Sequence, residues 1–224
     1  MSISLVSTCM LISVVIEIML NLLVFYQKEN VMPVAPELNK NQIKRVSNCF
    51  TGTRHEHRDR CYFFMLLYSG MRVGEPIQLK NEDVIDWDGN IKESTIITLT
   101  KNGKSRRVYF PKNLHKYISA YWSNKGDVNQ GGNLYFFQSQ QSPMDSMSLV
   151  NATRLIKNSF NRAGLPEFSS HSLRRSNAMF LRREVGLDLE VIREVLGHND
   201  IRTTQRYFAA SSIEASEGLS QLSF

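Results

Sequence analysis

The sequence has few cysteines, and their spacing builds neither a disulfide framework nor a zinc module. Only three are present in 224 residues, Cys9, Cys49 and Cys61, and none belongs to a Cys-x-x-Cys pair. An odd number at irregular spacing excludes the small disulfide-rich class and favours a reducing compartment. The alternating His-Glu-His at 55–57 does not share one helix face, so we expect no metal site.

Internal repeats and low-complexity tracts are also missing, and the composition is that of an ordinary folded protein. Hydrophobic residues make up 42% of the chain and charged residues 21%, which is typical of a globular domain. The length allows one good-sized domain, or one domain with a small appendage. A net charge of +6 favours a polyanionic partner, which is either nucleic acid or an acidic membrane face.

The N-terminal segment is apolar from Ile3 to Tyr26, interrupted mainly by Glu17, Asn21 and a few hydroxyl residues. It is long enough to span a bilayer, although a charge near its middle costs about 3 kcal/mol there. Three interpretations stay open: a membrane helix, a helix that packs on the domain or on another subunit, and the remnant of a larger N-terminal region. A polar, proline-bearing linker then leads to the body of the chain, so we expect residues 1–37 to be separate from it.

The body of the chain is predicted to be α+β and mainly α-helical. Apolar spacing predicts a short helix from Pro76 to Leu79, a last helix from Ile201 that carries Tyr207, and longer helices over residues 39–50, 57–68, 112–122, 146–163, 172–185 and 189–196. Three β-rich segments at 84–87, 95–100 and 106–110, separated by turns at 88–90 and 101–104, predict a small three-stranded antiparallel sheet.

Four short islands carry residues suited to cutting a phosphodiester without a metal. Such a reaction needs a nucleophile, forked arginine donors for the charged oxygens, and a general acid for the leaving oxygen. The islands are the arginine turn SGMRVGE at 69–75, the hairpin turn TKNGKSRRVYFP at 100–111, HSLRR at 171–175 and LGHNDIRTTQRY at 196–207. Each alone has an ordinary structural explanation. Their combination in this order is much more specific.

Together these motifs resemble the tyrosine recombinases of the phage-integrase type, over roughly residues 38–210. The resemblance implies that Arg72 and Arg174 clamp the scissile phosphate and that His198 is a third donor to it. It also implies that Tyr207 forms a 3′-phosphotyrosyl intermediate. His171 would assist proton transfer, Lys101 would be the general acid, with Lys104 as the alternative, and Glu75 would orient the arginines. The fold implied is a helical bundle with a small sheet, and neither a metal nor another cofactor is required.

The resemblance further implies double-stranded DNA target sites, a homotetramer on DNA, accessory DNA-bending proteins and a cytoplasmic protein associated with a nucleoid or plasmid. The remaining basic residues near the motifs are expected to bind DNA: Arg54, Arg58, Lys104, Arg106, Arg107, Arg175, Arg202 and Arg206. The C-terminal tail, residues 211–224, ends in apolar residues that either dock on a neighbouring subunit or fray.

Three features depart from the family pattern. Arg175 stands where many members carry a second histidine, and Pro76 stands where leucine is more usual. Many members also have a helical core-binding domain before the catalytic one, whereas only residues 1–37 precede it here. This chain is therefore expected to be either a short member or a truncated one. Three alternatives to a recombinase are a non-catalytic DNA-binding descendant, a type IB topoisomerase-like relaxase and, because of the apolar segment from Ile3 to Tyr26, a membrane protein that uses only its basic face.

Overall fold

A computed structural model of the chain describes residue 19 and residues 35–98, 105–127, 130–142 and 144–208. The chain divides into two units, Met1–Val34 and Ala35–Phe224. Met19 is the one described residue of the first unit, so the apolar segment at 3–26 otherwise lies outside the described residues. In the described part of the chain, no helix combines the length and the apolar character needed to span a membrane.

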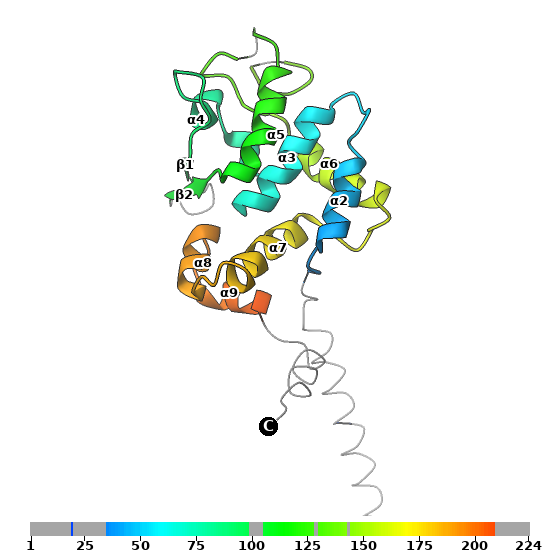
Figure 1. Cartoon of the computed structure of the whole chain (residues 1–224), viewed down its shortest axis with the longest axis vertical. Helices are drawn as coiled ribbons and strands as arrows, with labels where there is room; N and C mark the ends of the chain where they lie inside the picture. Colours follow the sequence, from blue (N-terminus) through cyan, green and yellow to red (C-terminus); the bar gives the residue numbers. More distant parts are fainter. Residues whose placement is uncertain (1–18, 20–34, 99–104, 128–129, 143, 209–224) are drawn as a thin grey trace, which may run out of the picture. The chain divides into compact units, whose positions relative to one another are not determined.

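The second unit is mainly helical, as predicted, with one small sheet between its early and late helices (Figure 1). Its elements are α2 (Lys40–Asn48), α3 (Glu56–Ser69), the 3-10 helix η1 (Pro76–Gln78), α4 (Asn81–Val84), β1 (Ser94–Thr98), β2 (Ser105–Tyr109), α5 (Lys112–Ser123), α6 (Leu149–Arg162), α7 (Ser170–Arg183), α8 (Leu189–Leu196) and α9 (Ile201–Phe208). The predicted helix at 189–196 has the bounds of α8.

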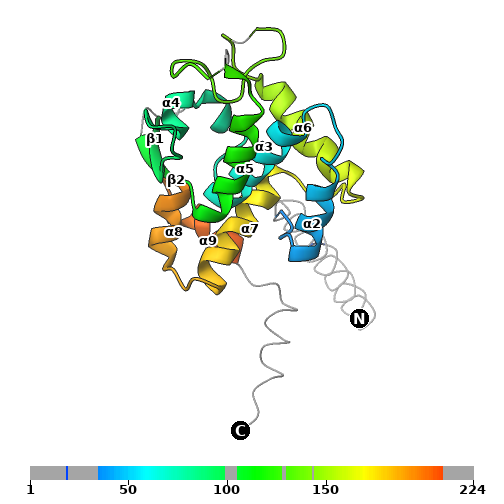
Figure 2. The same cartoon turned by 45° about the horizontal axis from the view of Figure 1, so that its top comes forward.

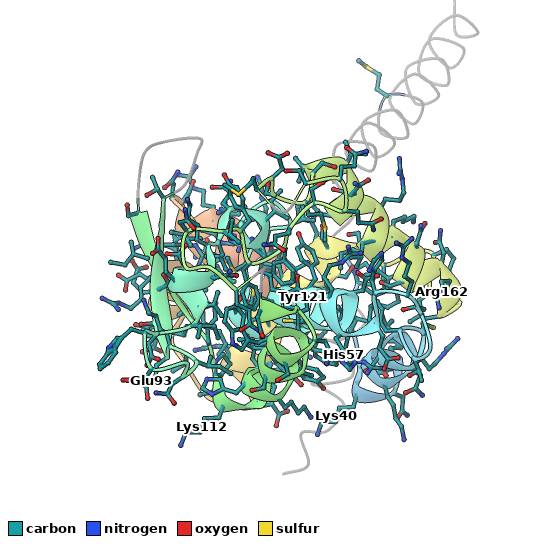
Figure 3. All side chains as sticks on the ribbon, turned by 90° about the horizontal axis from the view of Figure 1, so that it is seen from above. Lys40, His57, Glu93, Lys112, Tyr121 and Arg162 are labelled. Atoms are coloured by element: carbon teal, nitrogen blue, oxygen red, sulfur yellow. The ribbon has the colours of Figure 1, made fainter. Side chains whose placement is uncertain are left out.

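Helix α3 is the centre of the main core. Residues 61–67 of this helix, which include no charged residue, are all at most 5% exposed, as expected of a helix that is apolar on every side. It packs against α5 and α7, and Phe64 stacks on Tyr117 of α5 with ring centroids 3.8 Å apart. In Figure 3, Tyr121 of α5 lies among the inner side chains, whereas Lys40 and Arg162 lie at the periphery.

The sheet in the described residues has two strands rather than three. Strands β1 and β2 pair antiparallel, with Ser94 opposite Tyr109 and Thr98 opposite Ser105. The third strand expected at 84–87 is not confirmed, because Val84 ends helix α4 and Ile85 forms only an isolated bridge with Ile91. Residues 99–104 of the hairpin lie outside the described residues.

A second, smaller core joins the last three helices. Ala178 of α7 and Ile192 and Leu196 of α8 are fully buried, and Tyr207 and Phe208 of α9 pack against them. Figures 1 and 2 show α7, α8 and α9 side by side, with α8 next to strand β2. These helices therefore place His198 and Tyr207 next to strand β2 and the arginine turn at residues 69–75.

Candidate active site

The arginine turn begins where α3 ends at Gly70, which adopts the left-handed conformation with φ 63°. A Cβ atom at this position would lie 2.8 Å from Asn177 Oδ1 and 2.9 Å from Leu196 Cδ2, so only glycine fits. The next residues fold into a tight loop, in which the backbone N–H of Arg72 donates to Glu75 Oε2 at 2.7 Å. The turn is therefore fixed by its own acid and by the helices around it.

Arg174 of α7 joins this turn to the end of α8. Its side chain is buried, and its two terminal nitrogens donate to the carbonyl oxygens of Gly70 and Leu196. Burial, and then the nearby charge of Arg72, lower the pKa of Arg174 to about 10. The guanidinium therefore remains positive at neutral pH.

Glu75 lies between two guanidinium groups. Its Oε1 accepts from Arg72 Nη1 at 3.0 Å and its Oε2 accepts from Arg106 Nη2 at 2.7 Å. Arg72 also donates from Nη2 to the carbonyl oxygen of Gly197 at 3.1 Å, while 44% of its side chain stays exposed. Glu75 thus bonds to Arg72 through one oxygen, and part of that guanidinium stays open to a ligand.

His198 follows Gly197, the left-handed residue that ends α8. The imidazole is 6% exposed, and its Nδ1 shares a hydrogen bond of 2.8 Å with Thr204 Oγ1. Burial is the largest cause that lowers the pKa of His198, to about 3. The remaining causes are the nearby charges of Arg174, Arg72, Arg106 and Arg193. His198 is therefore neutral at pH 7 and suited to donating one N–H to an anion.

Tyr207 of α9 lies beside His198. The two ring centroids are 5.7 Å apart and the ring planes are inclined by 56°. The ring is half-buried against the small core of α7 and α8, and it lies near enough to Arg174 that a negative charge on Tyr207 raises the pKa of that arginine.

Of the other catalytic candidates, only His171 lies in the described residues. His171 is exposed at the start of α7, one turn before Arg174. Lys101 and Lys104 lie outside the described residues. The site of the described residues is therefore made from the arginine turn, α7, the end of α8 and α9.

The basic residues expected to bind DNA differ in exposure. Arg54, Arg107, Arg202 and Arg206 are exposed. Arg58 is half-buried and pairs with Asp59 at 2.7 Å, and Arg175 is half-buried and donates to the Ala35 carbonyl oxygen at 2.7 Å. Arg106 departs from the expectation, because it is buried and its terminal nitrogens are bonded inside the protein.

Two residues of the site were missed from the sequence. Thr204 is fully buried against His198, and its position three residues before Tyr207 was a usable signal, since i and i+3 share a helix face. Asn177 donates to the carbonyl oxygens of Leu67 and Tyr68 at the end of α3. An asparagine inside an apolar helix face carries no comparable signal.

The assembled site favours an anion. Two guanidinium groups, those of Arg72 and Arg106, bond to one carboxylate, Glu75, and a third, that of Arg174, lies close enough for the Glu75 charge to raise its pKa. Arginine forks match the paired oxygens of a phosphodiester, and a neutral histidine adds one more donor. In the described residues, no group of three or more His, Cys, Asp or Glu side chains is arranged to hold a metal ion.

Known proteins resemble this chain in sequence. The family model described as the phage integrase family matches residues 36–213. Tyrosine recombinase XerA of Thermococcus kodakarensis is 33% identical over 170 residues, which are 76% of this chain and 56% of the relative. Tyrosine recombinase XerD of Neisseria meningitidis serogroup B is 30% identical over 165 residues, 73% of this chain and 54% of the relative. The chain thus spans about half the length of these relatives.

Solved structures show the same fold. The crystal structure of XerA recombinase superimposes with a TM-score of 0.66 at 24% identity, covering 86% of this chain and 67% of that one. The XerH site-specific recombinase bound to its difH substrate gives a TM-score of 0.63 at 20% identity, covering 86% of this chain and 56% of that one. The mainly helical fold with a small antiparallel sheet is therefore that of tyrosine recombinases.

Proposed function

The chain belongs to the phage integrase family, and we propose that it is a site-specific tyrosine recombinase that cuts and rejoins DNA. One observation carries this proposal. Arg72, Arg174, His198 and Tyr207 come from four separate segments and meet around one anion-favouring site. The spacing of these residues in the sequence does not require such a meeting, whereas phosphoryl transfer by a tyrosine does.

The proposed reaction starts with Tyr207. Its phenolic oxygen attacks the phosphorus as its proton leaves, with His171 assisting, and the bond from phosphorus to the 5′ oxygen breaks. Lys101 donates a proton to that oxygen. Arg72, Arg174 and His198 stabilise the charge that develops on the non-bridging oxygens. The phosphotyrosine retains the bond energy. A 5′ hydroxyl of a partner strand then attacks its phosphorus, which releases the tyrosine and rejoins the DNA.

We also propose how the protein is organised on DNA. Residues 38–210 form the catalytic domain, and the exposed residues Arg54, Arg107, Arg202 and Arg206 contact the backbone of double-stranded DNA. Because each subunit cuts one strand, exchange between two sites requires a homotetramer, with accessory DNA-bending proteins as further partners. A protein with this activity works in the cytoplasm, on a nucleoid or a plasmid.

The test is covalent capture on DNA. The full chain is incubated with a pool of nicked suicide duplexes whose sequence is randomised around the nick, and covalent protein–DNA adducts are isolated and sequenced. We expect a consensus sequence to emerge with the wild type and no adduct with Tyr207→Phe, which should still bind DNA. A folded wild type that yields no adduct, or a Tyr207→Phe variant that yields as much, would refute the proposal.

The two alternatives that bind DNA give different results in the same assay. A non-catalytic DNA-binding protein would retain duplexes without covalent capture. A type IB topoisomerase-like relaxase would capture duplexes without a consensus and would relax a supercoiled plasmid that lacks the selected sequence. The family match, and catalytic candidates present at every expected position, favour the recombinase.

A further inference from the structure

Arg106 was expected to bind DNA, but its side chain is buried in the protein. It lies on strand β2 but is 8% exposed, whereas its neighbour Arg107 faces outward. Its Nη2 donates to Glu75 Oε2 at 2.7 Å and its Nη1 donates to the carbonyl oxygen of Val195 at 2.7 Å. One guanidinium thus links the strand, the arginine turn and the last turn of α8.

The packing around Gly197 shows how closely Arg106 is held. A Cβ atom on Gly197 would lie 2.3 Å from Arg106 Cδ and 2.8 Å from its Nε. Gly197 also has φ 64°. Position 197 therefore requires a glycine both for its backbone conformation and because the side chain of Arg106 lies beneath it. The side chain of Arg106 therefore lies directly under the turn that presents His198.

The single carboxylate of Glu75 is the ionic partner of two guanidinium groups, those of Arg72 and Arg106. If Arg106 were absent, Glu75 Oε2 would keep the Arg72 backbone N–H, but the carboxylate would lose its buried ionic partner. A carboxylate that loses such a partner shifts or takes up a proton. Arg72 would then lose the fixed acceptor that orients its guanidinium, and the carbonyl of Val195 would lose its donor.

We infer that Arg106 is a positioning residue that holds Glu75, and through it Arg72, together with the Val195–Gly197 turn before His198. The inference rests on the proposed function for its effect on rate, since these residues are the ones assigned to the phosphate. Arg106 acts through other side chains and makes no contact with DNA. It also ties the site to the strand that follows the Lys101 turn in sequence.

The test separates rate from binding, and uses a duplex selected by covalent capture. Arg106→Gln and Arg106→Lys should slow adduct formation at saturating DNA by about 100-fold, as expected when reacting groups are misplaced by about 1 Å. Their DNA affinity should keep the wild-type dependence on salt. Arg107→Gln, one residue along the strand, should instead lower the slope of log K against log salt by about 0.9, the value for one phosphate contact.

A double-mutant comparison shows whether Arg106 acts through Glu75. The double variant Arg106→Gln with Glu75→Gln should be no slower than the slower of the two single variants. Arg60→Gln is the matched control, because Arg60 pairs with Glu56 at 2.7 Å and also has a buried Nε, yet lies outside the site. It should form adduct at the wild-type rate.

Three outcomes would overturn the inference. The folded Arg106 variants could form adduct at the wild-type rate, or the rate losses of Arg106→Gln and Glu75→Gln could multiply in the double variant. Arg106→Gln could also lower the slope of log K against log salt. If the wild type itself forms no adduct, the proposed function fails instead. The pairing is then tested by urea unfolding of the same single and double variants. The double variant should lower the midpoint by less than the sum of the single shifts, and additive shifts would overturn the pairing.

Discussion

The Nδ1 atom of His198 lies 2.8 Å from the hydroxyl oxygen of Thr204, and both side chains are buried. This contact fixes the plane of the imidazole and leaves its Nε2 as the nitrogen available to a ligand. A histidine that donates to a phosphate from Nε2 carries its proton there, and the Thr204 hydroxyl, which can donate as well as accept, can satisfy the unprotonated Nδ1. Thr204 therefore belongs to the site, although it needs no contact with DNA.

Thr204→Val should weaken the proposed reaction by loosening His198. Valine has nearly the same shape but lacks the hydroxyl, and losing one hydrogen bond costs about 1 kcal/mol. If that loss is expressed in the transition state, adduct formation should be roughly fivefold slower. Thr204→Ser keeps the hydroxyl and should restore most of the rate. Equal rates for the valine and serine variants, measured at saturating DNA, would argue against this role.

The lowered pKa of His198 predicts how stability depends on pH. Burial and then the surrounding arginines lower the pKa to about 3 in the folded chain, whereas an unfolded histidine titrates near 6.5. Above pH 6.5 the residue is neutral in both states and has no effect. Between about 6.5 and 3 the unfolded chain binds a proton that the folded chain excludes, so stability falls as pH falls.

Urea unfolding of the wild type and His198→Gln from pH 7 to pH 4 measures this contribution. The difference between the two free energies of unfolding should change by up to about 1.4 kcal/mol per pH unit below pH 6, with the wild type losing more stability. Other titrating groups are common to both proteins and cancel. A constant difference across this range would show that His198 titrates normally when folded.

The helices were predictable from the sequence because their apolar periodicity is long. The third strand predicted at 84–87 is not confirmed, because a run of this length is too short to separate a strand from a helix end. Local hydrogen bonds decide its conformation. Asp83 Oδ2 accepts from the Lys80 backbone N–H at 2.7 Å, which starts helix α4, and Asp86 Oδ1 accepts from the N–H groups of Asp88 and Asn90, which closes the following turn.

The motifs predicted the candidate residues Arg72, Arg174, His198 and Tyr207, which lie together in the fold, but charge alone did not predict that Arg106 is buried. Charge does not tell which face of a strand a residue occupies. Alternation does, because Arg106 shares a face with Val108, which is fully buried. The link from Arg106 to Glu75 spans 31 residues and depends on how the strand packs against the arginine turn, which no local pattern determines.

Gly70→Ala should damage both stability and activity, and Gly52→Ala is its matched control. Both glycines have left-handed backbones, with φ 63° and 73°, so each alanine carries a backbone cost of about 1–2 kcal/mol. A Cβ at Gly70 would also meet Asn177 and Leu196, whereas one at Gly52 meets nothing within 4 Å. Thermal unfolding should therefore show a larger loss for Gly70→Ala.

The same pair of variants should differ in adduct formation, because Gly70 also supplies a carbonyl oxygen to Arg174. A shift of the turn would move Arg174 and Arg72 together, so Gly70→Ala should slow the reaction by an order of magnitude or more. Gly52→Ala should retain the wild-type rate below its unfolding temperature. If the two variants lose stability equally, the close packing against Asn177 has no energetic weight.

Helix α9 gives the last prediction, because two exposed arginines precede Tyr207 on it. Arg202 and Arg206 point into solvent, and they are four residues apart on one helix, so they present neighbouring positive charges to the same surface. A DNA backbone that brings its phosphate to Tyr207 would pass this face.

Replacing either arginine with glutamine should lower the slope of log K against log salt by about 0.9, one released counterion per contact. The adduct rate at saturating DNA should stay near that of the wild type, since neither side chain is bonded into the buried arginine cluster. A variant with an unchanged slope and a slower reaction would instead place its arginine within the chemistry of the site.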